Sequence, residues 1–162
     1  MTLKQCCDRL ECLGLKIAFI ESASSGYLSS QFSIYKNSGA DILLGGLVSY
    51  DPSIKVSVLH IDPQLIETFT AESAEVTQQM ALQGKFLFEQ ADIVVSCTGL
   101  LKAGGSATPS KPEGTFFICI NFNNQLIHFR YLIEGTPLER LNILTDYLAA
   151  ELLVILDSMN CS

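Results

Sequence analysis

A serine in a turn of small residues is the first candidate for chemistry in this chain. Residues 21–26 read Glu-Ser-Ala-Ser-Ser-Gly, between a predicted strand over 16–20 and a predicted helix. Such a strand-to-helix turn exposes backbone N–H groups, which bind an anion or an oxyanion. Ser22 is placed there as a nucleophile, and Glu21 is placed to orient a neighbour or a substrate amide. The alternative is that the serines of this turn only cap the helix, which is a common role of serine.

A serine nucleophile needs a base, and the two histidines are poorly placed for that role. His60 lies between leucine and isoleucine, and His128 alternates outward on a predicted hairpin strand. Lys55 follows the end of the apolar stretch 42–50, and the carboxyl ends of strands are where open α/β sheets bind ligands. A lysine acts as a base when burial lowers its pKa. The alternative for Lys55 is solvent exposure, as for most lysines.

A long glycine-rich loop between two predicted core strands, 93–97 and 115–120, is the third feature. Loops of this length in a small domain are commonly functional. The glycines that allow its backbone to approach a ligand closely are Gly99, Gly104 and Gly105. Lys111 adds one positive charge for a phosphate. A flexible crossover without a ligand is the alternative.

Helices and strands that would position these motifs follow from the apolar spacing. Helices are predicted over residues 3–13, 24–35, 53–59 and 63–69, and after the N-cap Ser73. Strands are predicted over residues 16–20, 42–50 (buried), 93–97, 115–120 and 126–131, the last two forming an antiparallel hairpin around 121–125. A capping box with Thr136, Pro137 and Glu139 begins the last helix. Helices alternate with strands first and the hairpin comes late, which predicts a layered α/β fold with a mixed sheet.

Composition limits the classes of protein and partner. The 162 residues predict one domain over 1–162, and 48% apolar residues are enough for a full core. The net charge is −7 and no basic run occurs, which argues against nucleic acid or an anionic membrane as partner. No segment reaches the roughly 20 apolar residues of a membrane span, and charges interrupt the N-terminus where a signal peptide would be apolar. A cytoplasmic location is therefore expected.

The six cysteines give no metal-binding pattern. They are Cys6, Cys7, Cys12, Cys97, Cys119 and Cys161. None forms a C-x-x-C pair, and only two histidines are available to join them, so no metal site is expected. Buried or free thiols in a reducing compartment are the expectation.

The three motifs together resemble the CinA C-terminal domain family, the nicotinamide-nucleotide amidases. The family's first signature, Ala-Glu-Ser-Cys-Thr-Gly-Gly, corresponds here to Ile-Glu-Ser-Ala-Ser-Ser-Gly at 20–26. Its second, Val-Thr-Tyr-Ser-Asn-x-x-Lys, corresponds to Val-Ser-Tyr-Asp-Pro-Ser-Ile-Lys at 48–55. Its third is Thr/Ser-Gly-Ile-Ala-Gly-Pro-x-Gly-Gly followed by Lys-Pro-x-Gly-Thr. Of this motif the chain keeps Thr98, Gly99, Lys111, Pro112, Gly114 and Thr115, with Leu101-Lys102-Ala103 in the middle.

The resemblance implies a three-layer α/β/α domain that hydrolyses the carboxamide of nicotinamide mononucleotide to nicotinate mononucleotide and ammonia. Ser22 would attack the amide carbon, Lys55 would take its proton with help from Tyr50, and N–H groups near Gly26 would hold the oxyanion. The residues implied in substrate binding are Glu21, Ser24, Gly26, Thr98, Gly99, Lys102, Gly104, Gly105, Lys111 and Thr115. The expected partner is a pyridine nucleotide, without metal or other cofactor, in a homo-oligomer such as a dimer.

One departure keeps other functions open. The family carries Gly-Asp-Arg before its last helix, whereas this chain has Gly135-Thr136-Pro137. Lys102 and Arg140 are the two cations considered as replacements for that arginine, with Lys102 slightly favoured. The rival hypotheses are a catalytically degenerate homologue that binds a nucleotide or a partner, and an enzyme that hydrolyses a different amide.

Overall fold

A five-stranded mixed sheet forms the centre of the computed structural model, which describes residues 1–161. Ser162, the last residue of the expected domain, lies outside this range. The strands are β1 (Ile17–Glu21), β2 (Leu43–Val48), β3 (Ile93–Gly99), β4 (Thr115–Phe122) and β5 (Gln125–Leu132), in the spatial order β2-β1-β3-β4-β5. β1 pairs in parallel with both β2 and β3, whereas β4 runs antiparallel to β3 and β5. The mixed sheet predicted from the element order is confirmed.

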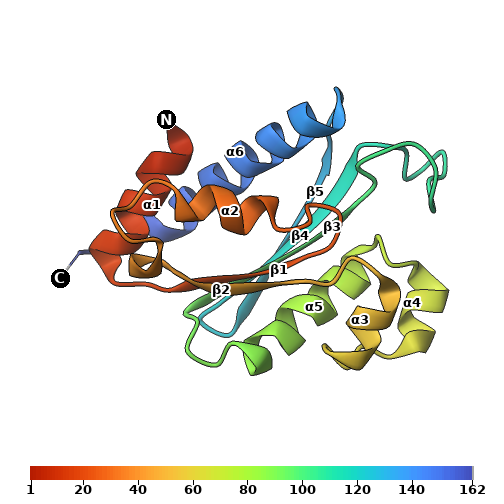
Figure 1. The fold of residues 1–162 in the computed structure, drawn as a ribbon, viewed down its shortest axis with the longest axis horizontal. Coiled ribbons are helices and arrows are strands. Elements are labelled where there is room, and N and C mark those ends of the chain that lie inside the picture. The colour runs from red at the N-terminus through yellow and green to blue at the C-terminus, as the bar shows by residue number, and fades with distance from the viewer. Residues whose placement is uncertain (162) are drawn as a thin grey trace.

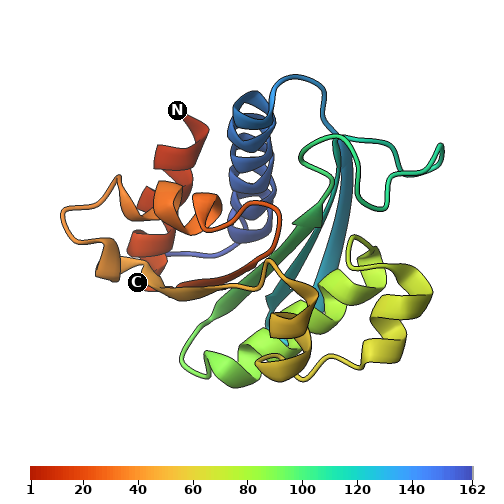
Figure 2. The same cartoon turned by 45° about the vertical axis from the view of Figure 1, so that its right-hand side comes forward.

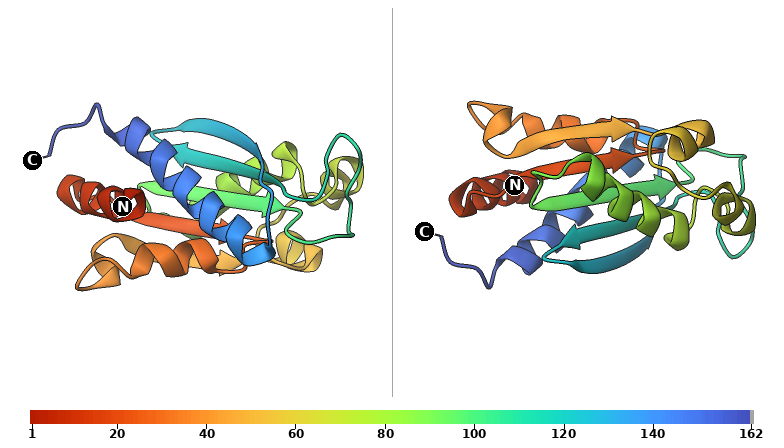
Figure 3. Two further views of the ribbon diagram at one scale, coloured as in Figure 1. Left: turned by 90° about the horizontal axis from the view of Figure 1, so that it is seen from above. Right: turned by 90° about the horizontal axis from the view of Figure 1, so that it is seen from below.

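Helices cover both faces of this sheet. They are α1 (Thr2–Leu13), α2 (Tyr27–Ser33), α3 (Pro52–Ser57), α4 (Pro63–Phe69), α5 (Ala74–Leu87) and α6 (Pro137–Leu156), with a 3₁₀ turn at Gly39–Asp41. One face carries α1, α2 and α6, and the other carries α3, α4 and α5 (Figures 1 and 2). Seen from above and below, α6 and α5 each cross the sheet on their own side (Figure 3). The α/β/α three-layer architecture is therefore confirmed.

Two apolar clusters hold the layers together, one on each side of the sheet. Side chains of α1, α2 and α6 pack on residues such as Phe19 and Val95. On the opposite face Met80 and other residues of α5 pack on Ile20 and Val94. Because neighbouring side chains of a strand point to opposite faces, the fully buried β1 and β3 feed both clusters. Among the described residues, no helix is both long enough and apolar enough to span a bilayer.

The helix ends agree with the predicted caps. Gly14 ends α1 in the left-handed conformation with φ 68°, and the Ser73 side chain accepts a hydrogen bond from the N–H of Val76. Thr136 and Glu139 form the reciprocal capping box at the start of α6. Local sequence therefore determines these boundaries.

Three predicted elements differ in the structure. β2, predicted as a buried strand, lies at the edge of the sheet and is only partly buried, because no strand pairs on its outer side. α2 begins at Tyr27 rather than Ser24, since the preceding turn ends with Gly26 at φ 90°. The hairpin turn contracts to Asn123-Asn124, both with positive φ, as in a type I′ turn.

The cysteine prediction also needs a correction. Cys12, at the end of α1, and Cys161, in the tail after α6, form a disulfide with their Cα atoms 5.5 Å apart. Arg9 joins the same two segments by donating to the carbonyl of Leu156 at 3.0 Å. The sequence separation of 149 residues hid this pairing. The remaining four cysteines are free and buried, as expected.

Candidate active site

Ser22 and Lys55 meet where β1 and β2 end. The two strands are parallel neighbours, so their carboxyl ends lie side by side, and the N–H of Ser49 donates to the Glu21 carbonyl at 2.7 Å. Asp51 then caps α3 by accepting from the N–H of Ser53, which places Lys55 in the following turn. The Lys55 Nζ lies 2.9 Å from the Ser22 Oγ. The structure thus brings together the predicted nucleophile and the predicted base.

Lys55 is fully buried, which is unusual for a lysine. Besides Ser22, its Nζ contacts the carbonyl oxygens of Ser49 and, at 3.5 Å, Tyr50. Burial lowers the pKa of this ammonium to about 8, while the negative charges of Glu72 and Asp51 act in the opposite direction. A neutral amine has two N–H donors and one lone pair. The two carbonyls accept the donors, which leaves the lone pair for the Ser22 hydroxyl.

Glu21 holds the Ser22 turn from behind. Its carboxylate accepts hydrogen bonds from the N–H of Leu28 at 2.8 Å and from the N–H and hydroxyl of Ser29 at 3.0 and 2.5 Å. It is 1% exposed. Both oxygens therefore bind α2, and the observed role of Glu21 is to fix this helix and the turn before it.

Tyr50 reaches Lys55 through its backbone and not through its phenol. Its side chain is 53% exposed, and no described residue hydrogen-bonds its hydroxyl. The proton relay predicted for the Tyr50 side chain therefore has no counterpart in this geometry.

The turn after Ser22 presents free backbone donors. Within it, the N–H groups of Ser25 and Tyr27 donate to the carbonyls of Ser22 and Ser24. Among the described residues, none accepts from the N–H of Ala23, Ser24 or Gly26. Ser24 is buried beside them and Gly26 is partly buried. These N–H groups are suited to an oxyanion at Ser22.

Several predicted binding residues in the glycine-rich loop, residues 100–114, and in the strand before it have structural roles. Gly104 and Gly105 have positive φ, 101° and 63°, which favours glycine. Gly99 has a packing reason, since a Cβ there would lie 2.3 Å from the Phe116 ring. The Thr98 hydroxyl pairs with that of Thr77 at 2.8 Å.

At the end of this loop, Thr115 begins β4. Its hydroxyl is buried and has no hydrogen-bond partner in the part of the chain that the structure describes. Of the predicted hydroxyl ligands, it and the Ser24 hydroxyl, which is also buried without a partner among the described residues, are left available.

The two lysines of the loop differ in their surroundings. Lys102 is exposed near the start of the loop. Lys111 donates to the Thr70 hydroxyl at 2.6 Å and to the Glu72 carbonyl at 2.7 Å, both in the segment between α4 and α5. Both acceptors are neutral, so the Lys111 charge is not paired by these contacts.

Arg140 does not replace the arginine that Pro137 displaces. Its guanidinium is 8% exposed and donates to the carbonyls of Ile133 and Leu101 and to the Glu113 carboxylate, at 2.9, 2.8 and 2.8 Å. These contacts join the two ends of the glycine-rich loop to α6. Its function is therefore structural, which leaves Lys102 as the remaining candidate.

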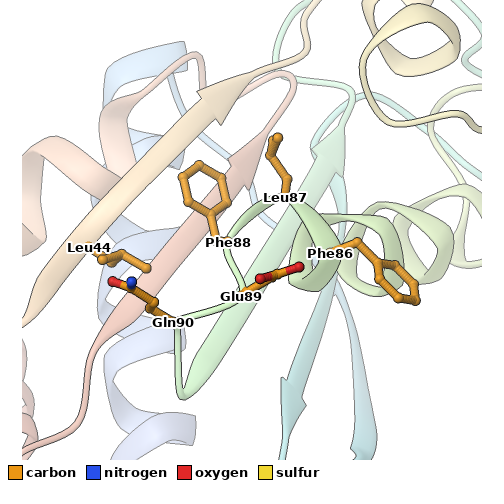
Figure 4. A pocket seen from close by; sticks show the side chains of 6 residues that line it. All are labelled: Leu44, Phe86, Leu87, Phe88, Glu89 and Gln90. Carbon is orange, nitrogen blue, oxygen red and sulfur yellow. The ribbon is translucent and has the colours of Figure 1, made fainter.

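A cavity of about 370 Å³ lies between this loop and the start of α5. Its lining includes Thr70, Glu72, Ser106, Lys111 and Arg130. It lies at the end of the sheet where β1 and β3 finish, which is also the end at which Ser22 lies. α5 begins at this end and runs back toward the start of β3. A second hollow, of about 380 Å³, at the other end of α5 is lined by Leu44 and residues 86–90 (Figure 4). It lies beside the starts of β2 and β3, away from Ser22.

Three residues near the site were not identified from the sequence. They are Ser49, whose carbonyl binds Lys55; Thr77, which pairs with Thr98; and Glu72, which lies beside the loop. Ser49 stands within the second motif, so its position was a signal. Thr77 and Glu72 belong to no motif, and no sequence pattern would reveal them.

The chain matches a known family in sequence and known structures in fold. The family model of the CinA C-terminal domain matches residues 2–159. The chain belongs to this family. Among curated relatives, a putative competence-damage inducible protein of Alkaliphilus metalliredigens is 31% identical over 131 residues, or 81% of this chain and 31% of that protein. A CinA-like protein of Chlorobaculum tepidum is 38% identical over 112 residues, or 69% and 25%. The chain thus spans about a quarter to a third of such relatives.

Solved structures of CinA superfamily proteins match over nearly their whole length. A protein of Enterobacter cloacae superposes with a TM-score of 0.85 and 27% identity, covering 95% of this chain and 90% of that one. One from Klebsiella pneumoniae gives a TM-score of 0.88 at 21% identity, covering 98% and 97%. The second likeness concerns the fold alone.

Proposed function

We propose that this chain is a serine amidohydrolase that converts nicotinamide mononucleotide to nicotinate mononucleotide and ammonia. The observation that carries the proposal is the 2.9 Å approach of the buried Lys55 Nζ to the Ser22 Oγ. A nucleophile within hydrogen-bond reach of a base with a lowered pKa is the arrangement that activates a serine. The substrate follows from membership in the CinA C-terminal domain family and its resemblance to the nicotinamide-nucleotide amidases.

In the proposed mechanism, neutral Lys55 accepts the hydroxyl proton as the Ser22 Oγ bonds to the amide carbon. The free N–H groups of Ala23 and Ser24 hold the negative oxygen that develops there. When the C–N bond breaks, Lys55 returns the proton to the leaving ammonia. A water molecule then attacks the ester on Ser22 while Lys55 takes one of its protons. The bond between the acyl carbon and the Ser22 Oγ breaks, Lys55 returns that proton to the Ser22 Oγ, and the nicotinate product leaves as its carboxylate. The Ser49 and Tyr50 carbonyls keep the amine oriented throughout.

The cavity beside the loop would take the nucleotide's ribose phosphate. Lys111 and Arg130 line it with positive charges, beside the carboxylates of Glu72 and Glu75. A phosphate binds well to such cations and to backbone N–H groups of a glycine-rich loop. Lys102, exposed on the same loop, is the proposed substitute for the arginine missing at Pro137.

An ammonia assay with nicotinamide mononucleotide tests the proposal. Wild type is expected to release ammonia, while Ser22→Ala is expected to lose most of the rate. Ser30→Ala is a matched control, because Ser30 is exposed on α2. Equal ammonia release from wild type and Ser22→Ala would reject the mechanism. A panel of pyridine nucleotides and simple amides distinguishes this substrate from a different amide.

The second candidate is a homologue that binds a nucleotide or a partner without turnover. It is favoured by Pro137 in place of the arginine and by Arg140, whose Nε and Nη1 donate to groups inside the protein. Calorimetry with nicotinamide mononucleotide separates the two. Tight binding without ammonia release supports the second candidate. Absence of any nucleotide binding excludes a nucleotide-binding homologue and leaves one that binds a partner.

A further inference from the structure

Glu72, in the segment between α4 and α5, contacts the glycine-rich loop at two places. The Ser106 hydroxyl donates to the Glu72 Oε2 at 2.6 Å. The Lys111 Nζ donates to the Glu72 carbonyl at 2.7 Å and to the nearby Thr70 hydroxyl at 2.6 Å. Two loop residues on either side of the loop's tip are therefore attached to one short segment. Figure 3 shows the loop beside α4 at one end of the sheet.

The other contacts of the loop lie at its ends and its outer side. Arg140 binds the Leu101 carbonyl and the Glu113 carboxylate at the two ends. Arg130 on β5 donates to the Ser110 carbonyl. Neither arginine hydrogen-bonds the stretch that contains Gly104 and Gly105. The Ser106–Glu72 hydrogen bond holds that stretch from within, next to Gly105.

The Glu72 carboxylate also acts on the base through its charge. The Lys55 Nζ contacts the Ser22 hydroxyl and the Ser49 and Tyr50 carbonyls, and the charges that act on it are those of Asp51 and Glu72. Asp51 belongs to the cap of Lys55's own helix. Glu72 is the charge contributed by another part of the fold, and it opposes the effect of burial on the pKa of Lys55. The carboxylate that binds the loop thus also favours the charged form of the base.

We propose that Glu72 is a positioning residue, which holds the glycine-rich loop in place through its carboxylate on Ser106 and its carbonyl on Lys111. Through the same carboxylate it acts on the protonation of Lys55. It touches neither the amide nor the nucleophile in the proposed mechanism. The catalytic consequence rests on the proposed function, whereas the two contacts can be measured without any substrate.

The test compares the full-length wild type with Glu72→Gln, Ser106→Ala and Glu67→Gln. Glu67→Gln is the matched control, since it removes one exposed carboxylate on α4. The first measurement is an NMR titration of the Lys55 side chain with a labelled ε-carbon. The second is the rate at which trypsin cuts after Lys102, the exposed lysine of the loop. Both are made without substrate, so they remain informative if no amide is hydrolysed.

Glu72→Gln is expected to lower the titration midpoint of Lys55 and to speed cleavage after Lys102. The amide oxygen of glutamine still accepts from Ser106 but carries no charge, so the weaker hydrogen bond increases the open population of the loop several-fold, and cleavage follows that population. Ser106→Ala removes the bond and increases that population roughly 10-fold or more. Ser106→Ala is expected to speed cleavage and to leave the midpoint at the wild-type value, because the charge remains. Glu67→Gln is expected to change neither.

If the protein hydrolyses the amide, the two variants should differ in which kinetic quantity they change. Ser106→Ala should raise KM with the pH profile unchanged, whereas Glu72→Gln should also move that profile to lower pH. The proposal is overturned if Glu72→Gln leaves either the Lys55 midpoint or the cleavage rate at the wild-type value. It is also overturned if Glu67→Gln matches Glu72→Gln.

Discussion

Lys55 must lose a proton before it can accept one from Ser22, and its surroundings decide the pH at which this happens. Burial lowers its pKa to about 8. We therefore expect kcat/KM to rise with pH, by tenfold per pH unit at first, and to level off above about 8. The pH profile of nicotinamide mononucleotide hydrolysis measures this. A profile that stays flat between about 6 and about 9 would argue against a lysine base.

The same burial means that charged Lys55 destabilises the fold at neutral pH. The pKa of lysine in an unfolded chain is near 10.4, against about 8 here. Between these values the unfolded chain binds more protons, so the free energy of unfolding rises with pH. Lys55→Met should abolish activity yet raise that free energy at pH 7 by roughly 1–3 kcal/mol.

Urea denaturation of wild type and Lys55→Met at neutral and alkaline pH checks this prediction. The advantage of the variant should shrink as the pH rises from about 8 toward about 10, because wild type then buries a neutral amine. A variant that is less stable than wild type at pH 7 would show that the hydrogen bonds of Lys55 outweigh the cost of its charge.

At this scale the motif order predicted which residues meet, but not where every side chain points. Ser22 and Lys55 come together as expected, because the backbone at two strand ends places them. Glu21 lies in the same motif, yet its carboxylate binds α2. Arg140 lies on the expected helix, yet the loop ends and Ile133 take its guanidinium. Long polar side chains follow the nearest unpaired groups, and a sequence does not state which groups those are.

At the scale of elements, local signals were reliable where they act within a few residues. The caps at Gly14, Ser73 and Thr136 mark helix ends as predicted. The burial predicted for β2 was wrong, because an apolar run with two glycines has the same composition in the centre of a sheet and at its edge. Only the pairing of strands, which is a long-range property, separates the two cases.

The capping box of α6 gives a prediction at this scale. The Thr136 hydroxyl accepts from the N–H of Glu139, and the Glu139 carboxylate accepts from the N–H of Thr136 at 2.7 Å. Thr136→Ala removes the first bond and should cost about 1 kcal/mol of stability. For a chain of this size that lowers Tm by about 2–4 °C. Calorimetry measures the change, with Thr136→Ser as the control that keeps the cap. Equal losses in both variants would assign the effect to the lost methyl group.

At the scale of the whole molecule, the layers followed from the order of the elements. Helices between parallel strands must cover the sheet faces, and the late hairpin adds antiparallel strands at one side. The contact between the end of α1 and the tail after α6 had no such signal. It joins the two ends of the chain, and the sequence offered only six cysteines without a pairing pattern.

The Cys12–Cys161 disulfide closes nearly the whole chain into a loop of 149 residues. In the chain-entropy account, such a crosslink reduces the freedom of the unfolded chain and adds about 2–5 kcal/mol to the free energy of unfolding. Oxidised wild type should therefore resist denaturant better than Cys161→Ser, and added reductant should remove the difference between them. The reduced wild type and the variant then share one denaturation midpoint, because both keep the same layers and core. Mass spectrometry of the unreduced protein establishes that the bond is present before each measurement. If oxidised and reduced wild type unfold at the same denaturant concentration, the crosslink contributes nothing, and the contacts of Arg9 with the tail are sufficient to hold the two ends together.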